Sequence, residues 1–372
     1  MSRTYAHSML QEIYEQPDAL AATISHYASE GLLLAESFPG IAEIFRGRQR
    51  LVIAASGSSR HAGLAGEIML EDLAGLAVDV EYASEYVYRS TYTLHDPGVL
   101  VISQSGETAD TLAALREAKS RGLNTTAITN NPASTMAREA DSSLPTIAGK
   151  EKAIPATKSF TTQLCVLYLL TLYLARLGGR MTAQMVSSHL EQLERLPGLL
   201  EAALERWEAL IEEVANGTRS ACGFLYLGRA VHYAMAREGA LKMKESAYIQ
   251  AEGYPAGELK HGPNALVSPD APLVVLATRD ESDPDSLLRY QKTLQLMRDM
   301  HAQGATILSI TTEGDQEAAM LSRYSIAVPP VSEFLLPLLE VVPLQLFAYF
   351  TAVLHGVNVD APRNLVKAVV TE

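Results

Sequence analysis

Short apolar runs alternate with longer amphipathic stretches along most of this chain. Residues 51–55 and 99–102 are continuous apolar runs of strand length, and a turn and then a helical pattern of ten or more residues follows each. Continuous apolar runs are typical of strands buried on both faces of a parallel sheet, and the helices between them of right-handed crossovers. The pattern predicts an α/β fold with helices on both faces of each sheet.

The same pattern occurs twice. When the chain is slid against itself by roughly 172 to 174 residues, the strand, turn and helix that begin at Leu51 fall on those that begin at Phe224. Further on, residues 97–129 fall on residues 272–312, strand for strand. We predict an N-terminal helical segment (1–35), a first domain (36–180), a helical connector with Trp207 (181–214), a second domain (215–355) and a tail (356–372).

Composition limits the class of protein. The chain has 372 residues, of which 48% are hydrophobic and 20% charged, enough for two cores. A net charge of −13 argues against nucleic acid and anionic membranes as partners. Two cysteines without metal-ligand spacing indicate a reduced, cytoplasmic protein, and no signal peptide is recognisable at the start. The apolar runs 164–175 and 334–354 are too short or too interrupted for membrane spans and predict buried helices.

A hydroxyl-rich turn follows the strand at 99–102. It contains Ser103, Gln104, Ser105 and Thr108, and a helical pattern begins directly after it. Unpaired N–H groups at a helix start, with hydroxyl donors nearby, form a binding site suited to a phosphate monoester. The alternative is an ordinary helix start, with Ser105 or Thr108 as cap and Glu107 in the first turn.

A second turn lies on the same rim of the predicted first domain. Residues 56–59, which include Gly57 and Ser59, follow the strand at 51–55. Ligand sites in parallel sheets lie beyond the carboxyl ends of the strands, so both turns and the loop after Ile128 are expected at one edge. The second copy has Ala277 to Glu281 where the first has its hydroxyl turn, which indicates that only the first copy binds phosphate.

Candidate reactive groups lie in the second half. Lys242 and Glu245 are spaced to share one face of a helix, either as a solvated ion pair or as a carboxylate base held beside a cation. His261 lies in a glycine-rich loop, where it is either a surface residue or a group that exchanges protons near neutrality, as sugar ring opening requires. Lys367, near the end of the chain, is either a surface lysine or an amine able to form a Schiff base with a ketone.

Several longer strings together resemble the sugar isomerase (SIS) family, and within it the isomerase half of glutamine–fructose-6-phosphate aminotransferases. They span nearly the whole chain, from Glu12-Ile13-Tyr14-Glu15-Gln16-Pro17 through the turn at 103–111 and the segments 157–163, 238–245 and 257–263 to Pro362-Arg363-Asn364-Leu365. The resemblance implies two tandem SIS domains with flavodoxin-like parallel sheets, acting on ketose and aldose 6-phosphates. It also implies a homodimer, because in such enzymes the neighbouring subunit contributes the histidine loop.

The resemblance also implies roles for individual residues. Ser103, Gln104, Ser105 and Thr108 would bind the phosphate, with Ser59 nearby. In the second half, Glu245 would move the proton between C1 and C2, Lys242 would assist it, His261 would open the ring and Lys367 would form the Schiff base. No metal or other cofactor is expected, since the cluster lacks metal-ligand spacing and an iminium can accept the electrons.

Two departures and an absence shape the functional hypothesis. Ala156 stands where the synthases have a sugar-contacting serine, and Val366 where they have a small alanine, so both substrate-contacting positions are expected to alter how the sugar sits. The chain begins about where the glutaminase domain of the synthases would end, so the leading expectation is a deaminase that converts glucosamine 6-phosphate into fructose 6-phosphate and ammonia. The alternatives are the isomerase domain of an aminotransferase and a phosphosugar sensor, which would not need Glu245, His261 and Lys367.

Overall fold

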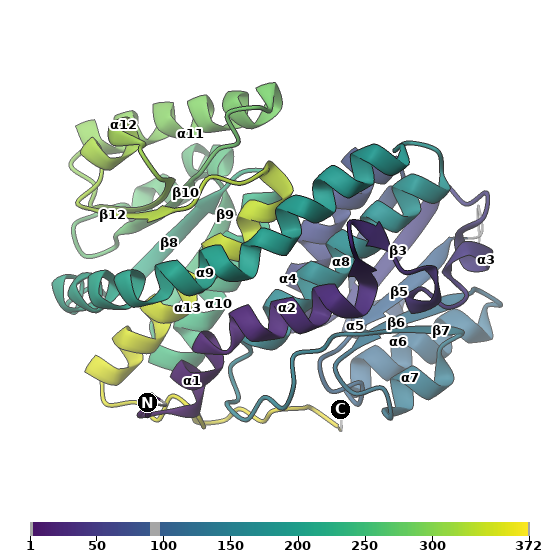
Figure 1. Ribbon diagram of the computed structural model, residues 1–372. Coiled ribbons are helices and arrows are strands. Elements are labelled where there is room, and N and C mark those ends of the chain that lie inside the picture. The colour runs from purple at the N-terminus through teal and green to yellow at the C-terminus, as the bar shows by residue number, and fades with distance from the viewer. Residues whose placement is uncertain (1–2, 90–96, 371–372) are drawn as a thin grey trace. The chain divides into compact units, whose positions relative to one another are not determined.

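The computed structural model describes residues 3–89 and 97–370 (Figure 1). Contacts divide the chain into two compact units, each assembled from separate segments. Unit 1 consists of residues 1–15, 152–157 and 198–365, and unit 2 of residues 16–151, 158–197 and 366–372. The predicted domain boundaries remain a prediction, and the two units are described separately below.

Unit 2 contains the first copy of the repeat as a five-stranded parallel sheet in the order β4-β3-β5-β6-β7. Its strands are β3 Arg50–Ala55, β4 Ala77–Tyr82, β5 Gly98–Ile102, β6 Thr125–Thr129 and β7 Ser142–Pro145. The central strands β5 and β6 are buried along their whole length, as continuous apolar runs predict.

Helices cover both faces of this sheet. They are α2 Gln16–Tyr27, α3 Ile41–Phe45, α4 Gly57–Met69, the π-helical turn η2 Leu70–Ala74, α5 Ala83–Tyr86, α6 Ala109–Ser120, α7 Thr135–Glu139 and α8 Lys158–Leu177. A short hairpin, β1 Ala28–Ser29 and β2 Leu32–Leu33, and the turn η1 Ala35–Ser37 follow α2. Apolar side chains of α5, α6 and α7 form one core cluster with β3, β5 and β6.

Unit 1 contains the second copy, again a five-stranded parallel sheet, in the order β12-β11-β10-β8-β9. Its strands are β8 Gly223–Gly228, β9 Gln250–Pro255, β10 Leu273–Ala277, β11 Ile307–Thr312 and β12 Tyr324–Val328. Its helices are α1 Ser8–Tyr14, α10 Val231–Ala247, η3 Ala256–His261, η4 Pro263–Leu266, α11 Pro284–Ala302, α12 Gln316–Met320, η5 Glu333–Leu335 and α13 Leu336–Leu354. Figure 1 shows α11 and α12 on one side of this sheet and α10 and α13 on the other.

The two sheets have the same connectivity. Numbered along the chain within each unit, the strands lie in the order 2-1-3-4-5, which is the flavodoxin-like arrangement. This confirms the predicted fold class of two α/β repeats. In both sheets the direction of winding changes between the first and third strands, β3 and β5 in one and β8 and β10 in the other, and ligand sites lie beyond the carboxyl ends of strands at this point.

A single helix, α9 Ala183–Gly217, occupies the region where the sequence predicts a helical connector. It contains Pro197, and the division between the units falls directly after this residue. Trp207, on the unit 1 part, is buried, and its indole Nε1–H donates a hydrogen bond of 2.8 Å to the carbonyl of Ala327. Its packing role is therefore the predicted one.

Within residues 3–89 and 97–370, two helices are long and apolar enough to cross a membrane by length and composition. They are α8 and the η5–α13 stretch, and 83% and 94% of their most apolar windows are buried inside the protein. Helices that are apolar on all sides are found in the cores of folded domains as well as in membranes. Their burial matches the prediction that these runs form core helices.

Candidate active site

The hydroxyl turn of unit 2 gathers its polar groups around one point. Ser103 follows the last residue of β5 and is buried, and its Oγ lies 2.9 Å from Thr108 Oγ1 and 3.5 Å from Ser105 Oγ. The same Ser103 Oγ accepts a 3.2 Å hydrogen bond from the N–H of Gly106. Three hydroxyls and the start of α6 thus meet within one turn, which suits an anion.

Gly106 allows this turn to form. Its φ is +66°, a left-handed conformation that side chains rarely adopt, and a Cβ at this position would lie 2.1 Å from Ser134 Oγ. The N–H of Met136 donates to the Gly106 carbonyl at 3.1 Å. The glycine therefore permits close approach between the turn and the start of α7.

The ordinary-cap alternative does not describe the turn. Thr108 is the N-cap residue of α6, but its side chain makes no capping hydrogen bond. Ser105 Oγ accepts from the Glu107 N–H at 3.1 Å inside the turn. Glu107 lies outside the first turn of α6, and its carboxylate accepts a 2.7 Å hydrogen bond from the Thr135 N–H at the start of α7. The hydroxyl of Thr108 contacts the hydroxyl of Ser103 instead of capping α6.

The neighbouring turn after β3 adds Gly57 and Ser59 at the start of α4. Gly57 has φ +54° and open space around its Cα, and Ser59 Oγ accepts a 3.1 Å hydrogen bond from Gln163 Nε2 of α8. Gln163 is buried, and its Oε1 has no hydrogen-bond partner among the described residues. The sequence interpretation did not include Gln163, whose link to Ser59 only the fold reveals.

In unit 1, α10 carries the candidate carboxylate base, Glu245. The ammonium of Lys242 lies 2.5 Å from Glu245 Oε2 and 3.4 Å from Glu238 Oε1. Lys242 and Glu238 are buried, whereas the Glu245 side chain is 23% exposed. A buried ammonium between two carboxylates fixes its neighbours in place because the alternative is an unpaired buried charge. Glu245 is therefore the anchored, accessible end of a three-residue charge row.

Glu245 borders a hollow of about 410 Å³ within unit 1. The hollow lies at the end of α10, and its other lining residues are Lys244, Tyr248, Ile249, Gln250, Arg363, Asn364 and Leu365. Residues 363–365 precede the predicted catalytic lysine by a few positions. The structure thus brings the carboxylate and the beginning of the tail to one hollow, although they are more than a hundred residues apart in sequence.

His261 is the last residue of η3 and is exposed. Its neighbour Lys260 forms a 2.6 Å ion pair with Asp299 on α11, which ties the loop to the second sheet's helices. No hydrogen bond or ion pair joins His261 to Glu245 in the part of the chain that the structure describes. Its role in ring opening, and its supply by a neighbouring subunit, remain predictions.

Lys367 lies in unit 2, the same unit as the hydroxyl turn. Its ammonium pairs with the carboxylate of Glu151, which is buried and also accepts hydrogen bonds from the N–H and the hydroxyl of Ser159 at 3.1 and 2.7 Å. Two residues further on, the Val369 carbonyl accepts a 2.9 Å hydrogen bond from the Ala109 N–H, the first residue of α6. The tail is therefore fixed at the helix whose start forms the hydroxyl turn.

The two positions that depart from the synthase pattern lie in different units. Ala156, in unit 1, is partly exposed in a segment whose N–H groups at Lys152 and Ala153 donate to the buried carboxylate of Glu12. Val366, in unit 2, is 63% exposed. Their predicted contacts with the sugar remain untested.

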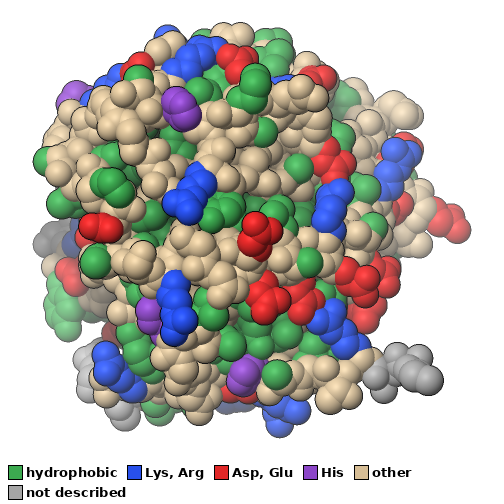
Figure 2. All heavy atoms as spheres, turned by 90° about the vertical axis from the view of Figure 1, so that its left-hand side faces the viewer, with side chains coloured by type: hydrophobic (Ala, Val, Ile, Leu, Met, Phe, Trp, Pro, Cys, Tyr) green, Lys and Arg blue, Asp and Glu red, His purple; other side chains and the backbone are tan. Residues whose placement is uncertain are grey.

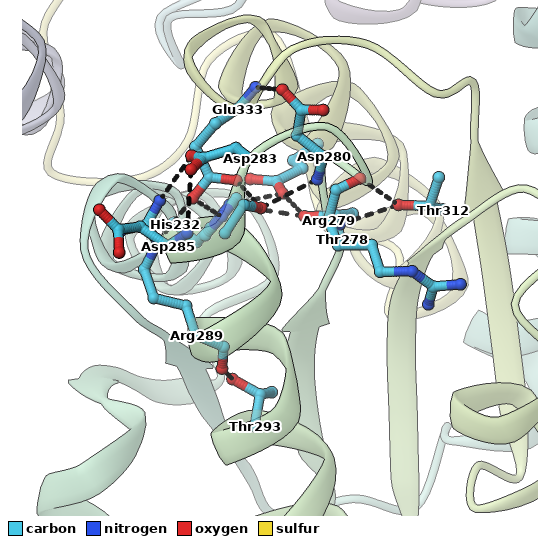
Figure 3. A network of polar contacts seen from close by, with 12 residues as sticks. His232, Thr278, Arg279, Asp280, Asp283, Asp285, Arg289, Thr293, Thr312 and Glu333 are labelled. Atoms are coloured by element: carbon cyan, nitrogen blue, oxygen red, sulfur yellow. Dashed lines mark hydrogen bonds and ion pairs between the residues drawn. The ribbon is translucent and has the colours of Figure 1, made fainter.

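The second repeat places charged side chains of its own where the first has hydroxyls (Figure 3). At the start of α10, His232 Nδ1 lies 2.7 Å from Glu340 and Nε2 3.2 Å from Glu333, and all three side chains are buried. Thr278, directly after β10, donates to Glu340, and Ser286 donates to Glu333. Internal carboxylates thus occupy the region beyond β8 and β10, which agrees with the prediction that this copy has lost phosphate binding.

The charges of this network reinforce one another. Burial lowers the pKa of His232, but the nearby charges of Glu340 and Glu333 and the hydrogen bonds to both outweigh burial, so the pKa of His232 is raised. Burial raises the pKa of Glu333, yet the His232 charge, hydrogen bonds from His232 and Ser286 and the charge of Arg289 hold it below its usual range. The imidazole is therefore held as a cation between carboxylates.

Sequence reasoning missed Glu238, Glu151, Gln163 and Glu12. Glu238 has a sequence signal, because it precedes Lys242 by four residues on a helix. The other three residues each bind a partner more than a hundred positions away in the sequence, so no spacing rule finds them. Glu151 also binds a residue across a short loop. Among residues 3–89 and 97–370, no group of three or more His, Cys, Asp or Glu side chains is placed to hold a metal ion.

Surface charge agrees with the composition. On the face shown in Figure 2, Lys and Arg side chains lie among acidic and apolar ones and form no continuous basic patch. Local groups, such as the hydroxyl turn, would therefore have to supply any affinity for phosphate.

Two parallel sheets of flavodoxin-like order, with a hydroxyl turn at the switch point of the first, define an α/β protein with two doubly wound repeats. The sequence profile of the SIS domain matches residues 44–173 and 223–355. The chain belongs to the SIS domain family.

The similar curated proteins are aminotransferases. The chain is 41% identical over 370 residues to the glutamine–fructose-6-phosphate aminotransferase [isomerizing] of Chlorobaculum tepidum and 43% identical over 373 residues to that of Pseudomonas putida. Each alignment covers 99% of this chain and 59% of the relative. The chain thus spans somewhat more than half the length of these relatives.

Solved structures with a similar fold include a domain of an aminotransferase and a deaminase. The C-terminal domain of glucosamine-fructose-6-phosphate aminotransferase from Francisella tularensis matches with a TM-score of 0.90 and 35% identity, covering 97% of this chain and 100% of that one. A glucosamine-6-phosphate deaminase from Thermotoga maritima matches with a TM-score of 0.73 at 23% identity, over 97% of this chain and 99% of that one, which shows a shared fold alone. In sequence and fold the chain is therefore similar to the C-terminal domain of these aminotransferases.

Proposed function

We propose that this chain interconverts a ketose 6-phosphate plus ammonia with the corresponding 2-amino aldose 6-phosphate, most directly fructose 6-phosphate and glucosamine 6-phosphate. The names of the similar proteins favour this aminotransferase-type isomerase over a dedicated deaminase. The two readings share one set of residues and differ in the direction of net reaction. The deaminase hypothesis therefore becomes one outcome of the test.

In the amino-aldose to ketose direction, the phosphate docks on Ser103, Ser105 and Thr108, and orientation is its main contribution because it lies far from the reacting carbons. His261 passes the O5 proton as the ring opens. Glu245 removes the C2 proton and delivers it to C1, which leaves an imine at C2. Water adds to that imine and ammonia leaves; alternatively, Lys367 adds first and water then releases the ketose from its Schiff base.

The observation that carries the proposal is the charge row on α10. A proton shuttle must remain within hydrogen-bond reach of two adjacent carbons, so it needs a fixed carboxylate with one accessible end. Glu245 has this arrangement, since Lys242 anchors it at 2.5 Å while 23% of its side chain stays exposed beside the hollow. A phosphosugar sensor would need the hydroxyl turn but no such group.

Three assays on the purified chain test the proposal. Glucosamine 6-phosphate is supplied and fructose 6-phosphate and ammonia are measured; fructose 6-phosphate is supplied with ammonium and glucosamine 6-phosphate is measured; fructose 6-phosphate is supplied alone and glucose 6-phosphate is measured. Glu245→Gln should lower the rate in every active direction by about 10² to 10⁴. Glu313→Gln, at a surface ion pair with Arg206, is the matched control and should retain activity.

The outcomes separate the hypotheses. Net ammonia release at low ammonium, without measurable synthesis at high ammonium, would favour the deaminase reading. Turnover that Glu245→Gln leaves unchanged would remove the proposed shuttle. Binding of the sugar phosphates with no turnover in any assay would favour a sensor.

The homodimer with a shared histidine loop is also part of the proposal. It is supported by the exposed position of His261, at the end of η3. Mixing inactive Glu245→Gln and His261→Asn chains should restore activity to about a quarter of the sites if each site takes its histidine from a partner. Mixtures that stay inactive, although co-purification of an affinity-tagged chain with an untagged one shows that they exchange subunits, would argue against a shared site.

A further inference from the structure

The helix that presents Glu245 ends on a residue in an unusual conformation. Tyr248, directly after α10, has φ +58° and ψ 28°, in the left-handed region. Helices commonly end with a left-handed residue, but it is usually glycine, because a Cβ is strained there. A tyrosine in this region is strained, and such outliers persist where surrounding contacts impose them.

Contacts with the tail hold Tyr248 in place. The N–H of Arg363 donates a 2.6 Å hydrogen bond to Tyr248 Oη, and the Arg363 guanidinium carbon lies 4.3 Å from the centre of the tyrosine ring. The next residue, Asn364, is also left-handed, with φ +62°. Both partners line the hollow beside Glu245. The tyrosine therefore meets the tail through its hydroxyl and its ring at once.

This contact limits the number of tail residues that lie between two anchored positions. Lys367 lies four residues after Arg363, whereas the preceding anchor is Asp360, whose carboxylate accepts hydrogen bonds from the N–H groups of Ser8 and Met9 at 2.9 and 2.8 Å. Lys367 is itself anchored by its ion pair with Glu151, so without the Tyr248 contact the segment between anchors grows from four residues to seven. The entropic cost of closing a flexible segment rises with length as (3/2)RT ln n, so the anchored position of Lys367 would become about two- to threefold less favoured.

We propose that Tyr248 is a positioning residue that clamps the tail at Arg363, shapes the hollow beside Glu245 and fixes where the lysine-bearing segment leaves unit 1. This inference rests on the proposed function, because the segment matters through Lys367. It assigns to Tyr248 no contact with substrate. The strained backbone is maintained because its side chain must reach the tail.

The clamp is tested first without substrate. Trypsin cleaves after arginine, so the loss of residues 364–372 from the full folded chain, followed by intact mass, reports how often the Arg363–Asn364 bond is accessible. Tyr248→Gly should raise this cleavage rate at least threefold, while its thermal midpoint should not fall, because glycine relieves the left-handed strain. Tyr248→Phe, which retains the ring and loses the hydrogen-bond acceptor, should give a smaller increase.

Matched controls are available on one exposed and one partly buried tyrosine. Tyr88, 77% exposed, provides Tyr88→Gly, and Tyr254, whose hydroxyl bonds Glu252, provides Tyr254→Phe. Both should cleave at the wild-type rate at Arg363. If Tyr248→Gly and Tyr248→Phe also cleave at that rate, the clamp does not exist and the proposal is overturned.

The functional half is tested with sugar phosphate. Trapping by borohydride of the fructose 6-phosphate adduct on Lys367 should slow about threefold or more in Tyr248→Gly, and kcat should fall with it. KM should stay near the wild-type value, because the hydroxyl turn belongs to the other unit. Faster cleavage with unchanged trapping and kcat would reduce Tyr248 to a structural contact and overturn its positioning role.

Failure of the proposed function has a different signature. If the wild-type chain neither turns over sugar phosphates nor forms a trapped adduct, the assignment of Lys367 fails whatever the tyrosine does. The cleavage comparison still decides whether the clamp exists. The two failures are therefore distinguishable.

Discussion

The two repeats place different side chains at the switch points of their sheets: neutral hydroxyls in the first and charged groups in the second. Each parallel sheet leaves helix N-termini and strand ends unsatisfied at its switch point, a region of positive potential. The first repeat surrounds this region with neutral hydroxyls at Ser103, Ser105 and Thr108. The second fills it with the protein's own carboxylates, Glu333 and Glu340, around a cationic His232.

The comparison shows that the same place in two copies of one fold can carry neutral hydroxyls or a buried charge network. The neutral donors of the hydroxyl turn leave this positive region able to bind an external anion. In the second repeat, internal carboxylates neutralise the same region in the folded protein. The second repeat therefore has a stabilised α10 N-terminus, and the far end of the same helix presents Glu245. Removing charge in one repeat should change stability, and removing hydroxyls in the other should change binding.

The largest expected effect is on the His232 network. His232→Gln leaves the buried carboxylate of Glu340 without its cation and leaves Glu333 with Arg289 alone, so the free energy of unfolding should fall by about 3 to 5 kcal/mol. Urea unfolding followed by circular dichroism measures this loss. His301→Gln, on an exposed histidine at the end of α11, is the control. A loss below 1 kcal/mol would show that the network is not a structural replacement for a bound anion.

The same pair predicts a pH window. The raised pKa of His232 contributes stability that is complete below its ordinary value of 6.5 and is lost as the pH rises through the folded-state pKa. The lowered pKa of Glu333 contributes stability that is complete above its ordinary value of 4.5 and is lost as the pH falls through the folded-state pKa. The stability gap between wild type and His232→Gln should therefore be widest between pH 4.5 and 6.5. A gap that widens steadily towards alkaline pH would contradict the assignment.

The hydroxyl turn should respond in binding. Ser103→Ala with Thr108→Val removes two donors to a charged ligand, each worth about 1.5 to 3 kcal/mol, so affinity for the sugar phosphate should fall at least tenfold. Calorimetric titration of wild type and the double variant measures the loss. His232→Gln, assayed at a temperature where it is folded, should retain wild-type affinity. If His232→Gln loses as much affinity for the sugar phosphate as the double variant, the two repeats do not have the different roles assigned to them.

The smallest effect is expected at Thr278. Thr278→Val removes one hydrogen bond to the buried Glu340 carboxylate, which retains His232, so unfolding should become about 1 to 2 kcal/mol easier. Sugar phosphate binding should not change. Weaker binding in this variant would indicate that the second repeat still contributes to the ligand site.

Much of the fold was predictable because its signals are local. Apolar runs such as 99–102, followed by glycine and hydroxyl turns, predict buried parallel strands, and the internal match between the two halves predicts two copies. The positions of Ser103 to Thr108 and of Lys242 and Glu245 follow from the same local rules, since a strand end or a helical spacing fixes each. The relation of Glu107 to α7 was not predictable, because its partner Thr135 lies 28 residues further on.

The sequence by itself determined the α/β class, the location of the hydroxyl turn and the helix face shared by Lys242 and Glu245, because neighbouring residues set backbone conformation and side-chain period. Tertiary structure alone decided that Lys367 pairs with Glu151, 216 residues away, and that Arg363 lies on Tyr248, 115 residues away. Such pairs are chosen by which surfaces meet when the sheets and helices pack. No local propensity specifies that meeting, so the partners of the tail became visible only in the folded chain.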